Sequence, residues 1–324
     1  MSEEAVHNPH DKLFKESFSR REMAVDFFQN YLPAEIHERI AWETLHLEPG
    51  SFTDGALRGS ESDLLYTVQI DNHPVRLYCL FEHQSCPDAW LPLRLLRYIL
   101  GIWDQFRKQN NKASKLPPIL PIVLYQGGDT WTCDAALSRL IDIPEGLAAF
   151  QPDFRHLLID LNDIASDNLQ GTPSLQTILL ALKTSRHHAN KDLELLIRLL
   201  AAIIHNDSAL IRSVMLYLYS VDNKTDINEY INKAAALKQP DLQEEIMTIA
   251  DTLRREGKLE GKLEGKQEAL REYILDILEL RFQSVSYSIK KQLEEITDPT
   301  VLRQLHRLAV KTESIESFLQ ELAA

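Results

Sequence analysis

The chain has 324 residues, 44% of them hydrophobic and 26% charged, which is typical of a folded protein long enough for several domains. A formal net charge of −13 argues against a protein that coats nucleic acid over its whole surface, but leaves room for a local groove. Three cysteines, Cys79, Cys86 and Cys133, form no C-x-x-C pair, which argues against a disulfide framework or a zinc–cysteine site. Because the sequence shows no apolar leader and no membrane-spanning segment, we expect a cytoplasmic protein that needs no membrane.

The first elements along the chain are one helix and three strands. Apolar residues recurring at helical spacing predict an amphipathic helix over residues 11–31. Strand patterns follow over residues 41–48, 63–70 and 75–84. The turn signal at residues 71–74 joins the last two strands into a hairpin.

A second helix and two more strands complete the predicted sheet. The helix is expected over residues 90–109 and the strands over residues 118–125 and 156–161. Pro118 and Pro121 indicate either an edge position or a late start to strand pairing. The resulting order predicts an α/β (α+β) fold, in which a mixed sheet is flanked by helices.

The rest of the chain has a helical pattern. We divide it into a core over residues 1–172, a helical extension over 173–252, a repeat over 253–269 and a small helical domain over 270–324, with three short helices. The repeated unit is Glu-Gly-Lys-Leu, and each glycine costs a helix about 1 kcal/mol relative to alanine. Two interpretations stay open for it, a closely packed helix or a semi-flexible linker. We expect the C-terminal helices to form a homo-oligomer.

Three polar side chains at strand ends form the candidate site. Asp63 opens its strand, whereas Glu82 and Gln84 share one face near the end of the next strand, because side chains alternate. If the hairpin turns at residues 71–74, Asp63 lies directly opposite Glu82, with Cβ atoms roughly 4.5–5.5 Å apart.

Two carboxylates this close repel each other unless a cation lies between them. Carboxylate oxygens suit hard cations such as Mg²⁺, with Mn²⁺ or Ca²⁺ as alternatives. A cation at Asp63 and Glu82 can activate a water and stabilise charge on a phosphate. The other interpretation is that Asp63 caps a loop and Glu82 is a solvated strand residue.

Several segments of the sequence, in the same order, resemble the Rpn family of recombination-promoting nucleases. These segments are His10–Lys15, Ser62–Tyr66, Glu82–Ser85, Pro87–Asp88, Leu93–Tyr98, Pro121–Gly128 and Leu158–Leu161. The resemblance covers roughly residues 8 to 250. The Glu-Gly-Lys repeat and the C-terminal helices resemble only the variable tails of the group.

The resemblance implies membership of the PD-(D/E)XK superfamily, with a restriction-endonuclease-like core and divalent-metal-dependent cleavage of DNA. Asp63 then matches the motif aspartate and Glu82 the motif glutamate. Gln84 stands where many members of the superfamily carry lysine, and an amide can only orient a water. We interpret this as a variant active site, in an enzyme that promotes DNA recombination and whose partner is DNA. No small-molecule cofactor is expected.

Other charged residues are weaker candidates for the same site. Six basic residues and one acid between residues 90 and 118 make Arg94 and Arg97 candidates for phosphate contact. Lys12 and Lys15, which begin the first helix, are candidates for DNA contact by resemblance. The alternatives to a nuclease are a transposase-like or DNA-binding recombination factor, and a non-catalytic protein-interaction module.

Two further residues are candidates for supporting the site. Asp160 ends a buried-looking strand, from which it could support the metal. His83 lies between Glu82 and Gln84 in the sequence and is a candidate for a supporting or core position.

Overall fold

The computed structural model describes residues 9–49, 63–82, 88–184, 190–221, 226–283 and 285–322. The chain divides into two compact units, residues 1–246 and residues 247–324, which we describe separately. None of the described helices is both long and apolar enough to cross a membrane.

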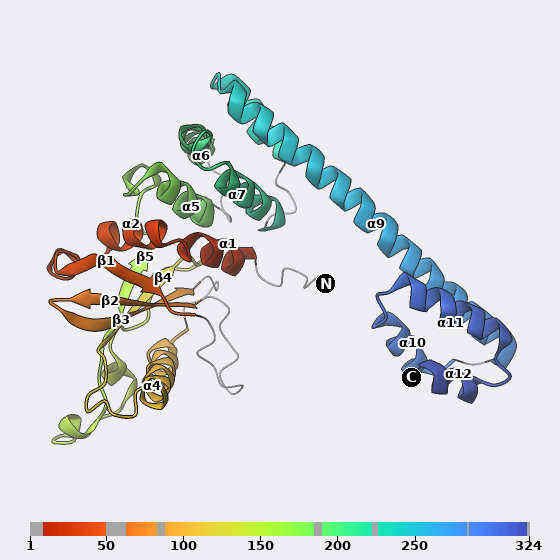
Figure 1. The fold of residues 1–324 in the computed structure, drawn as a ribbon, viewed down its shortest axis with the longest axis horizontal. Coiled ribbons are helices and arrows are strands. Elements are labelled where there is room, and N and C mark those ends of the chain that lie inside the picture. Colours follow the sequence, from red (N-terminus) through yellow and green to blue (C-terminus); the bar gives the residue numbers. More distant parts are fainter. Residues whose placement is uncertain are drawn as a thin grey trace. The chain divides into compact units, whose positions relative to one another are not determined.

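The first unit is built on a five-stranded mixed sheet (Figure 1). The strands are β1 (Ile40–Leu47), β2 (Asp63–Ile70), β3 (His73–Glu82), β4 (Ile119–Tyr125) and β5 (Leu157–Asp160), in that spatial order. The pairs β1–β2 and β2–β3 are antiparallel, whereas β3–β4 and β4–β5 are parallel. The predicted mixed sheet is therefore confirmed.

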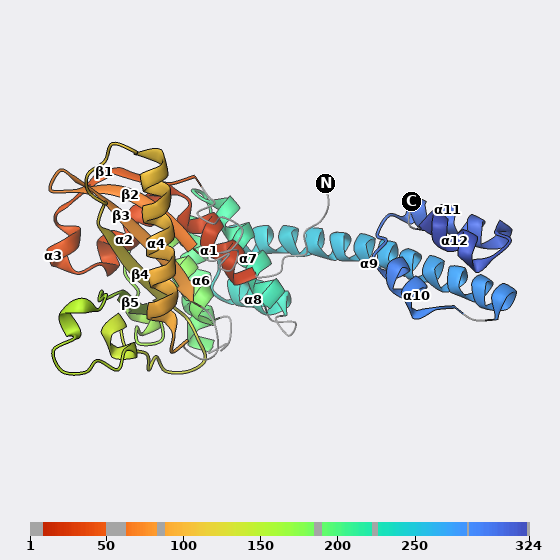
Figure 2. The same ribbon diagram turned by 90° about the horizontal axis from the view of Figure 1, so that it is seen from below.

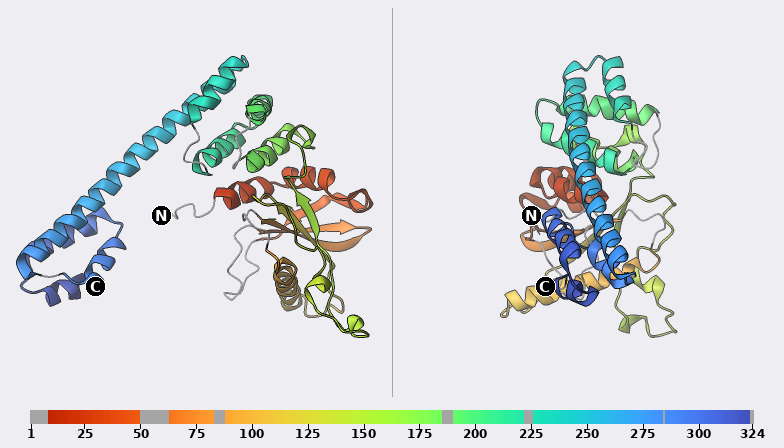
Figure 3. Two further views of the ribbon diagram at one scale, coloured as in Figure 1. Left: turned by 180° about the vertical axis from the view of Figure 1, so that it is seen from behind. Right: turned by 90° about the vertical axis from the view of Figure 1, so that its right-hand side faces the viewer.

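Helices cover both faces of this sheet. On one face lie α1 (Pro9–Phe18), α2 (Arg21–Tyr31) and α5 (Pro173–Thr184), and on the other lies α4 (Leu91–Gln109), as Figures 1 and 3 show. The remaining helices of the first unit are α3 (Ala34–His37), α6 (Asn190–Ile203), α7 (Ser208–Val221) and α8 (Ile227–Ala236), with short 3-10 turns η1 (Leu137–Leu140), η2 (Ala148–Phe150) and η3 (Ser166–Asn168).

The single helix predicted over residues 11–31 is wrong, because the structure has a break between α1 and α2. Arg20 has an extended backbone there, and its side chain forms an ion pair with Asp207. The buried Tyr66 hydroxyl donates to the carbonyl of Phe18 at 2.6 Å, which satisfies an acceptor at the end of α1. The break lets Phe18 pack edge-on against Phe27 of α2.

The hairpin between β2 and β3 has a tighter turn than the sequence predicted. Asp71 and Asn72 both have positive φ, at 49° and 64°, as a two-residue turn requires. Pairing starts at Ile70 with His73 and places Asp63 opposite Leu80, two residues away from the predicted partner Glu82. The predicted register is therefore wrong by two positions, which leaves every side chain on its predicted face.

Pro121 lies within β4, where pairing with β3 already runs from Ile119 but pairing with β5 starts later. β4 lies between β3 and β5, so it is not an edge strand. Its pairing with β5 begins at Ile122 and Leu157, one residue after Pro121. The missing amide of Pro121 therefore does not interrupt the pairing with β5.

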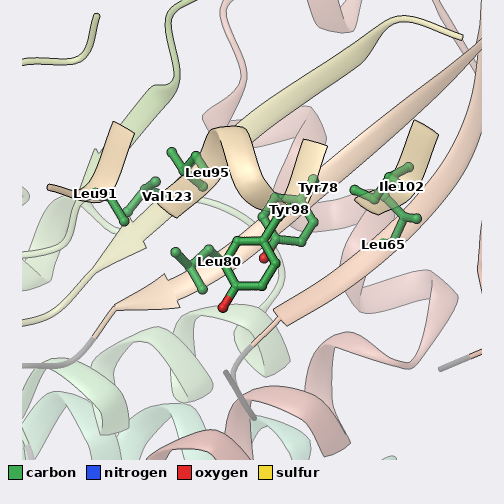
Figure 4. Close-up of a cluster of buried hydrophobic side chains, with 8 residues drawn as sticks. All are labelled: Leu65, Tyr78, Leu80, Leu91, Leu95, Tyr98, Ile102 and Val123. Carbon is green, nitrogen blue, oxygen red and sulfur yellow. The ribbon is translucent and has the colours of Figure 1, made fainter. Parts of the chain in front are cut away.

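The face of the sheet under α4 has an apolar core, which Figure 4 shows in close-up. Its buried members are Leu65, Tyr78, Leu80, Leu91, Leu95, Tyr98, Ile102 and Val123. On the opposite face, Phe14 of α1 stacks on Phe81 of β3 with ring centroids 5.1 Å apart. The core fixes α4 against the face of the sheet that carries Asp63 and Glu82.

The second unit is wholly helical within the residues that the structure describes. Along α9 (Pro240–Phe282) pack α10 (Tyr287–Glu294), α11 (Pro299–Lys311) and α12 (Ile315–Leu322), as Figure 2 shows. The Glu-Gly-Lys repeat is helical as part of α9, and α9 continues beyond it to Phe282. Three short helices follow α9, which is the number predicted for residues 270–324, although residues 270–282 themselves belong to α9.

Candidate active site

Asp63 and Glu82 lie on the same face of the sheet, at the same end of their strands. Asp63 begins β2 opposite Leu80, and Glu82 ends β3 two residues further on. Residues two apart on a strand share a face, so Asp63 and Glu82 are diagonal neighbours, with backbones roughly 7–8 Å apart. They are not the directly opposed pair that the sequence predicted, but both lie on the side of α4.

Asp63 is positioned by a hydrogen bond within the hairpin. The Tyr78 hydroxyl donates to Asp63 Oδ2 at 2.9 Å. Burial raises the pKa of Asp63 above its ordinary value, while the Tyr78 bond and the charge of Lys15 lower it and Asp11 raises it. Burial, with a smaller effect of Asp63, also raises the pKa of Tyr78 well above its usual value, so its hydroxyl stays a donor.

Glu82 is held by an arginine from the helix above it. Its side chain is almost fully buried and accepts a hydrogen bond from Arg94 of α4. Arg94 also contacts Asp88 at 3.3 Å, and among the described residues its Nε has no hydrogen-bond partner. A buried carboxylate without a cation is strongly unfavourable. Arg94 is therefore the counter-ion of Glu82 in this arrangement.

Asp160 ends β5 in line with Glu82. The register pairs Glu82 with Tyr125 and Tyr125 with Asp160, so all three side chains share the face of α4. Burial raises the pKa of Asp160. Its Oδ1 accepts a hydrogen bond from the backbone amide of Asn162 at 2.8 Å. Two strand spacings separate Asp160 from Glu82, roughly 10 Å. Asp160 therefore lies beside the pair rather than within it.

The basic candidates are placed differently from one another. Lys12 on α1 is exposed and lies 3.9 Å from Glu16, whereas Lys15 is close enough for its charge to act on Asp63. Arg97 is exposed on α4, but Arg94 is engaged with carboxylates. His83 and Gln84 lie outside the described residues.

One residue of the site was missed at the level of sequence. Tyr78 shares a face with Leu80 and Glu82 by simple alternation, so the strand pattern alone placed its hydroxyl on the side of the carboxylates. The signal was present, but a buried tyrosine is more often a core residue. Its bond to Asp63 depends on the two-residue turn that sets the register.

The chemistry of the carboxylates suits a hard cation. Mg²⁺ is commonly held by one or two carboxylates and keeps several waters, so Asp63 and Glu82 are of the right type and number. Within the described residues, no three His, Cys, Asp or Glu side chains come together as a metal-binding group. A cation bound through Glu82 must also compete with Arg94.

Comparison with known proteins gives the family. Residues 8–212 match the family described as "Putative transposase, YhgA-like". The chain belongs to this family. It is 30% identical over 271 residues to the recombination-promoting nuclease RpnA of Escherichia coli (strain K12), with 80% of this chain and 87% of RpnA covered. The resemblance to the Rpn family is thereby confirmed.

Two further relatives come from the same organism. The chain is 39% identical over 122 residues to the recombination-promoting nuclease RpnC, covering 38% of this chain and 40% of RpnC. It is also 29% identical over 262 residues to the inactive recombination-promoting nuclease-like protein RpnE, covering 79% and 85%. The family therefore includes proteins named as nucleases and proteins named as inactive. No solved structure matches the chain.

Proposed function

We propose that this protein is a divalent-metal-dependent DNA endonuclease of the PD-(D/E)XK type, which hydrolyses phosphodiester bonds and so promotes recombination. The observation that carries the proposal is the placement of Asp63 and Glu82 on one face at one end of the hairpin. Membership of a family with relatives named as recombination-promoting nucleases supports it.

Each residue of the site then has a separate task. Asp63 and Glu82 would hold the cation, Mg²⁺ or alternatively Mn²⁺ or Ca²⁺, and Tyr78 orients the Asp63 carboxylate. When bound, such a cation lowers the pKa of a water and stabilises charge on the phosphate. Gln84 orients the attacking water through its amide.

The surroundings of the pair bind the substrate. Lys12, Lys15 and Arg97 attract the DNA backbone, where lysine and arginine supply much of the affinity and make it salt-dependent. Asp160 supports the site from β5, two strands away from Glu82. Arg94 balances the charge of Glu82; with a cation bound to Glu82, its guanidinium would be free to bind a phosphate oxygen.

A second candidate function is a non-catalytic interaction protein. The ion pair of Glu82 with Arg94 favours it, because a carboxylate committed to arginine does not need a metal. The relative RpnE shows that the family has members named as inactive.

Cleavage of supercoiled plasmid by the purified full-length chain tests the proposal. We expect nicking or cutting with Mg²⁺, Mn²⁺ or Ca²⁺, and none with EDTA. Asp63→Ala should slow cleavage by roughly a hundredfold or more, since a cation ligand is lost. The matched control is Asp104→Ala, which removes an exposed aspartate from α4.

The other outcomes separate the alternatives. A folded protein that cleaves with none of the metals supports the non-catalytic function. Joined strands in place of simple breaks support a transposase-like activity. Equal cleavage by the wild type and Asp63→Ala overturns the assignment of the site.

A further inference from the structure

An exposed tryptophan begins the helix that lies over the candidate active site. Trp90 immediately precedes α4, and its side chain is 62% exposed, although tryptophan is highly buried in most proteins. The next residue, Leu91, and Leu95 one turn later point into the core between α4 and the sheet, as Figure 4 shows. Trp90 does not belong to that core, so its ring is open to a ligand.

A series of polar contacts links the backbone of Trp90 to Glu82. The amide of Trp90 donates a hydrogen bond to Asp88 Oδ1 at 2.8 Å, and Asp88 Oδ2 lies 3.3 Å from Arg94. Arg94 in turn donates to the carboxylate of Glu82. The carbonyl of Trp90 accepts a hydrogen bond from the amide of Arg94 at 3.0 Å, so one helical turn, roughly 6 Å along the axis, separates the two. Trp90 is therefore held in a fixed position relative to the candidate site.

The outer side of α4 continues from Trp90 with apolar and basic side chains. Leu93 and Leu100 are 42% and 50% exposed, and Arg97, which lies between them at helical spacing, is exposed too. We call these positions the α4 stripe. They are Trp90, Leu93, Arg97 and Leu100. Residues 90–118, which include the stripe, contain six basic residues and one acid in a chain of net charge −13, so the charge around the stripe favours an anionic partner.

An exposed aromatic ring next to basic side chains suits nucleic acid with unpaired bases. Arginine and lysine attract the phosphates of any nucleic acid, whereas an aromatic side chain stacks on the face of a base. In a duplex, each base is already stacked between its neighbours, so a protein ring reaches a base face only at the cost of unstacking. A base that is already unpaired costs least to unstack, so stacking on Trp90 favours single-stranded over duplex DNA.

We infer that the candidate site acts on single-stranded or locally unpaired DNA, and that Trp90 stacks on an unpaired base close to the phosphate that is cut. The inference rests on the proposed function, because it assigns a substrate class to that same site. Arg97 binds a phosphate of the same strand, and Leu93 and Leu100 provide apolar surface for its bases and sugars. Trp90 is thus a specificity-determining residue rather than a ligand of the cation.

Fluorescence anisotropy with the full-length chain tests this preference. The probe is a labelled oligonucleotide of mixed sequence, offered as a single strand or as a duplex, in EDTA so that binding is measured without cleavage. We expect the wild type to bind the single strand roughly tenfold more tightly than the duplex, and Trp90→Ala to lose most of that difference. Trp90→Phe keeps an aromatic ring and should retain it. The matched control is Phe150→Ala, which removes another exposed aromatic side chain, from η2, and should bind like the wild type.

A phosphate contact should behave differently from a base contact. Arg97→Ala should weaken binding of the single strand and of the duplex by similar factors, and should lower the salt dependence of both, because a phosphate carries no information on base pairing. Far-UV circular dichroism reports whether each variant is folded. A matching change in the ratio of the two affinities in Trp90→Ala and Arg97→Ala would show that Trp90 has no separate role, and would overturn the inference.

The remaining outcomes separate this inference from the proposed nuclease activity. A chain that prefers the single strand through Trp90 but cuts no plasmid contradicts the nuclease activity and supports the assignment of Trp90. A chain that cuts plasmid but binds duplex as tightly as single strand keeps the nuclease activity and overturns the substrate class. If the wild type binds neither DNA, the inference is wrong, and a protein partner becomes the better explanation of the α4 stripe.

Discussion

The two units of the chain differ in which side chains they bury and which they expose. The first unit buries charge: Glu82 is 3% exposed and paired with Arg94 beneath α4. The second unit exposes apolar surface: Leu280 of α9 is 85% exposed. A buried charge needs an ion or a counter-charge, which Arg94 supplies here, whereas an exposed apolar side chain gains stability only when something covers it. The comparison teaches that the first unit balances its buried charge internally, whereas the second unit leaves large apolar side chains in contact with solvent.

The largest effect is expected from removing the counter-ion of Glu82. Arg94→Met should lower the free energy of unfolding by about 3–5 kcal/mol, because it leaves a carboxylate buried without a partner. Chemical denaturation followed by tryptophan fluorescence measures this. The double variant Glu82→Gln, Arg94→Met removes the charge as well and should recover much of the loss. An Arg94→Met protein as stable as the wild type would contradict the pairing.

A core change in the second unit tests whether the two units are independent. Ile274→Ala should lower the stability of that unit by about 2–5 kcal/mol, since it removes a fully buried side chain. All four tryptophans, Trp42, Trp90, Trp103 and Trp131, lie in the first unit. Circular dichroism should therefore show an earlier transition while tryptophan fluorescence does not. A parallel shift of both signals would show that the units unfold together.

A smaller effect is expected from the hydroxyl that orients Asp63. Tyr78→Phe should cost about 1 kcal/mol of stability, because one hydrogen bond is lost. That bond lowers the pKa of Asp63, so its loss should move the acid limb of the cleavage profile to higher pH. The control is Tyr98→Phe, which alters a tyrosine of the same apolar core. An unchanged pH profile would remove the positioning role of Tyr78.

The smallest effect is expected on the pH dependence of the free energy of unfolding, through Asp63. Burial raises the pKa of Asp63, so the folded chain binds a proton at this site more readily than the unfolded chain. Stability therefore falls as pH rises from the ordinary aspartate range through the raised value. Asp63→Asn removes this dependence and should be more stable than the wild type at neutral pH, with the difference vanishing in acid. Thermal melts across pH check this; a constant difference would contradict it.

The sequence predicted the strands and the shared face of the site well, for a physical reason. Apolar alternation fixes which side chains point inward, and an error of two residues in register does not change the face. Asp63 and Glu82 therefore fell on one side even though their predicted pairing was wrong. The error came from the length of the turn. Asp71 and Asn72 form a two-residue turn because both take positive φ angles, which aspartate and asparagine permit but do not require.

Contacts between distant elements could not be predicted in the same way. Arg94 was placed among the phosphate contacts because its charge was visible, while its bond to Glu82 depends on how α4 lies over the sheet. The break at Arg20 depends on Tyr66 and Asp207, which come from other parts of the chain. The helical state of the Glu-Gly-Lys repeat goes against glycine propensity, and context rather than local sequence decides it.

Titration calorimetry with Mn²⁺ tests most directly the central claim, that Asp63 and Glu82 share a cation. The wild type should bind the ion, and Asp63→Asn and Glu82→Gln should each weaken binding by roughly tenfold or more, whereas the exposed control Asp104→Asn should bind like the wild type. Equal binding by all four folded proteins, or no binding by the wild type, would contradict the account.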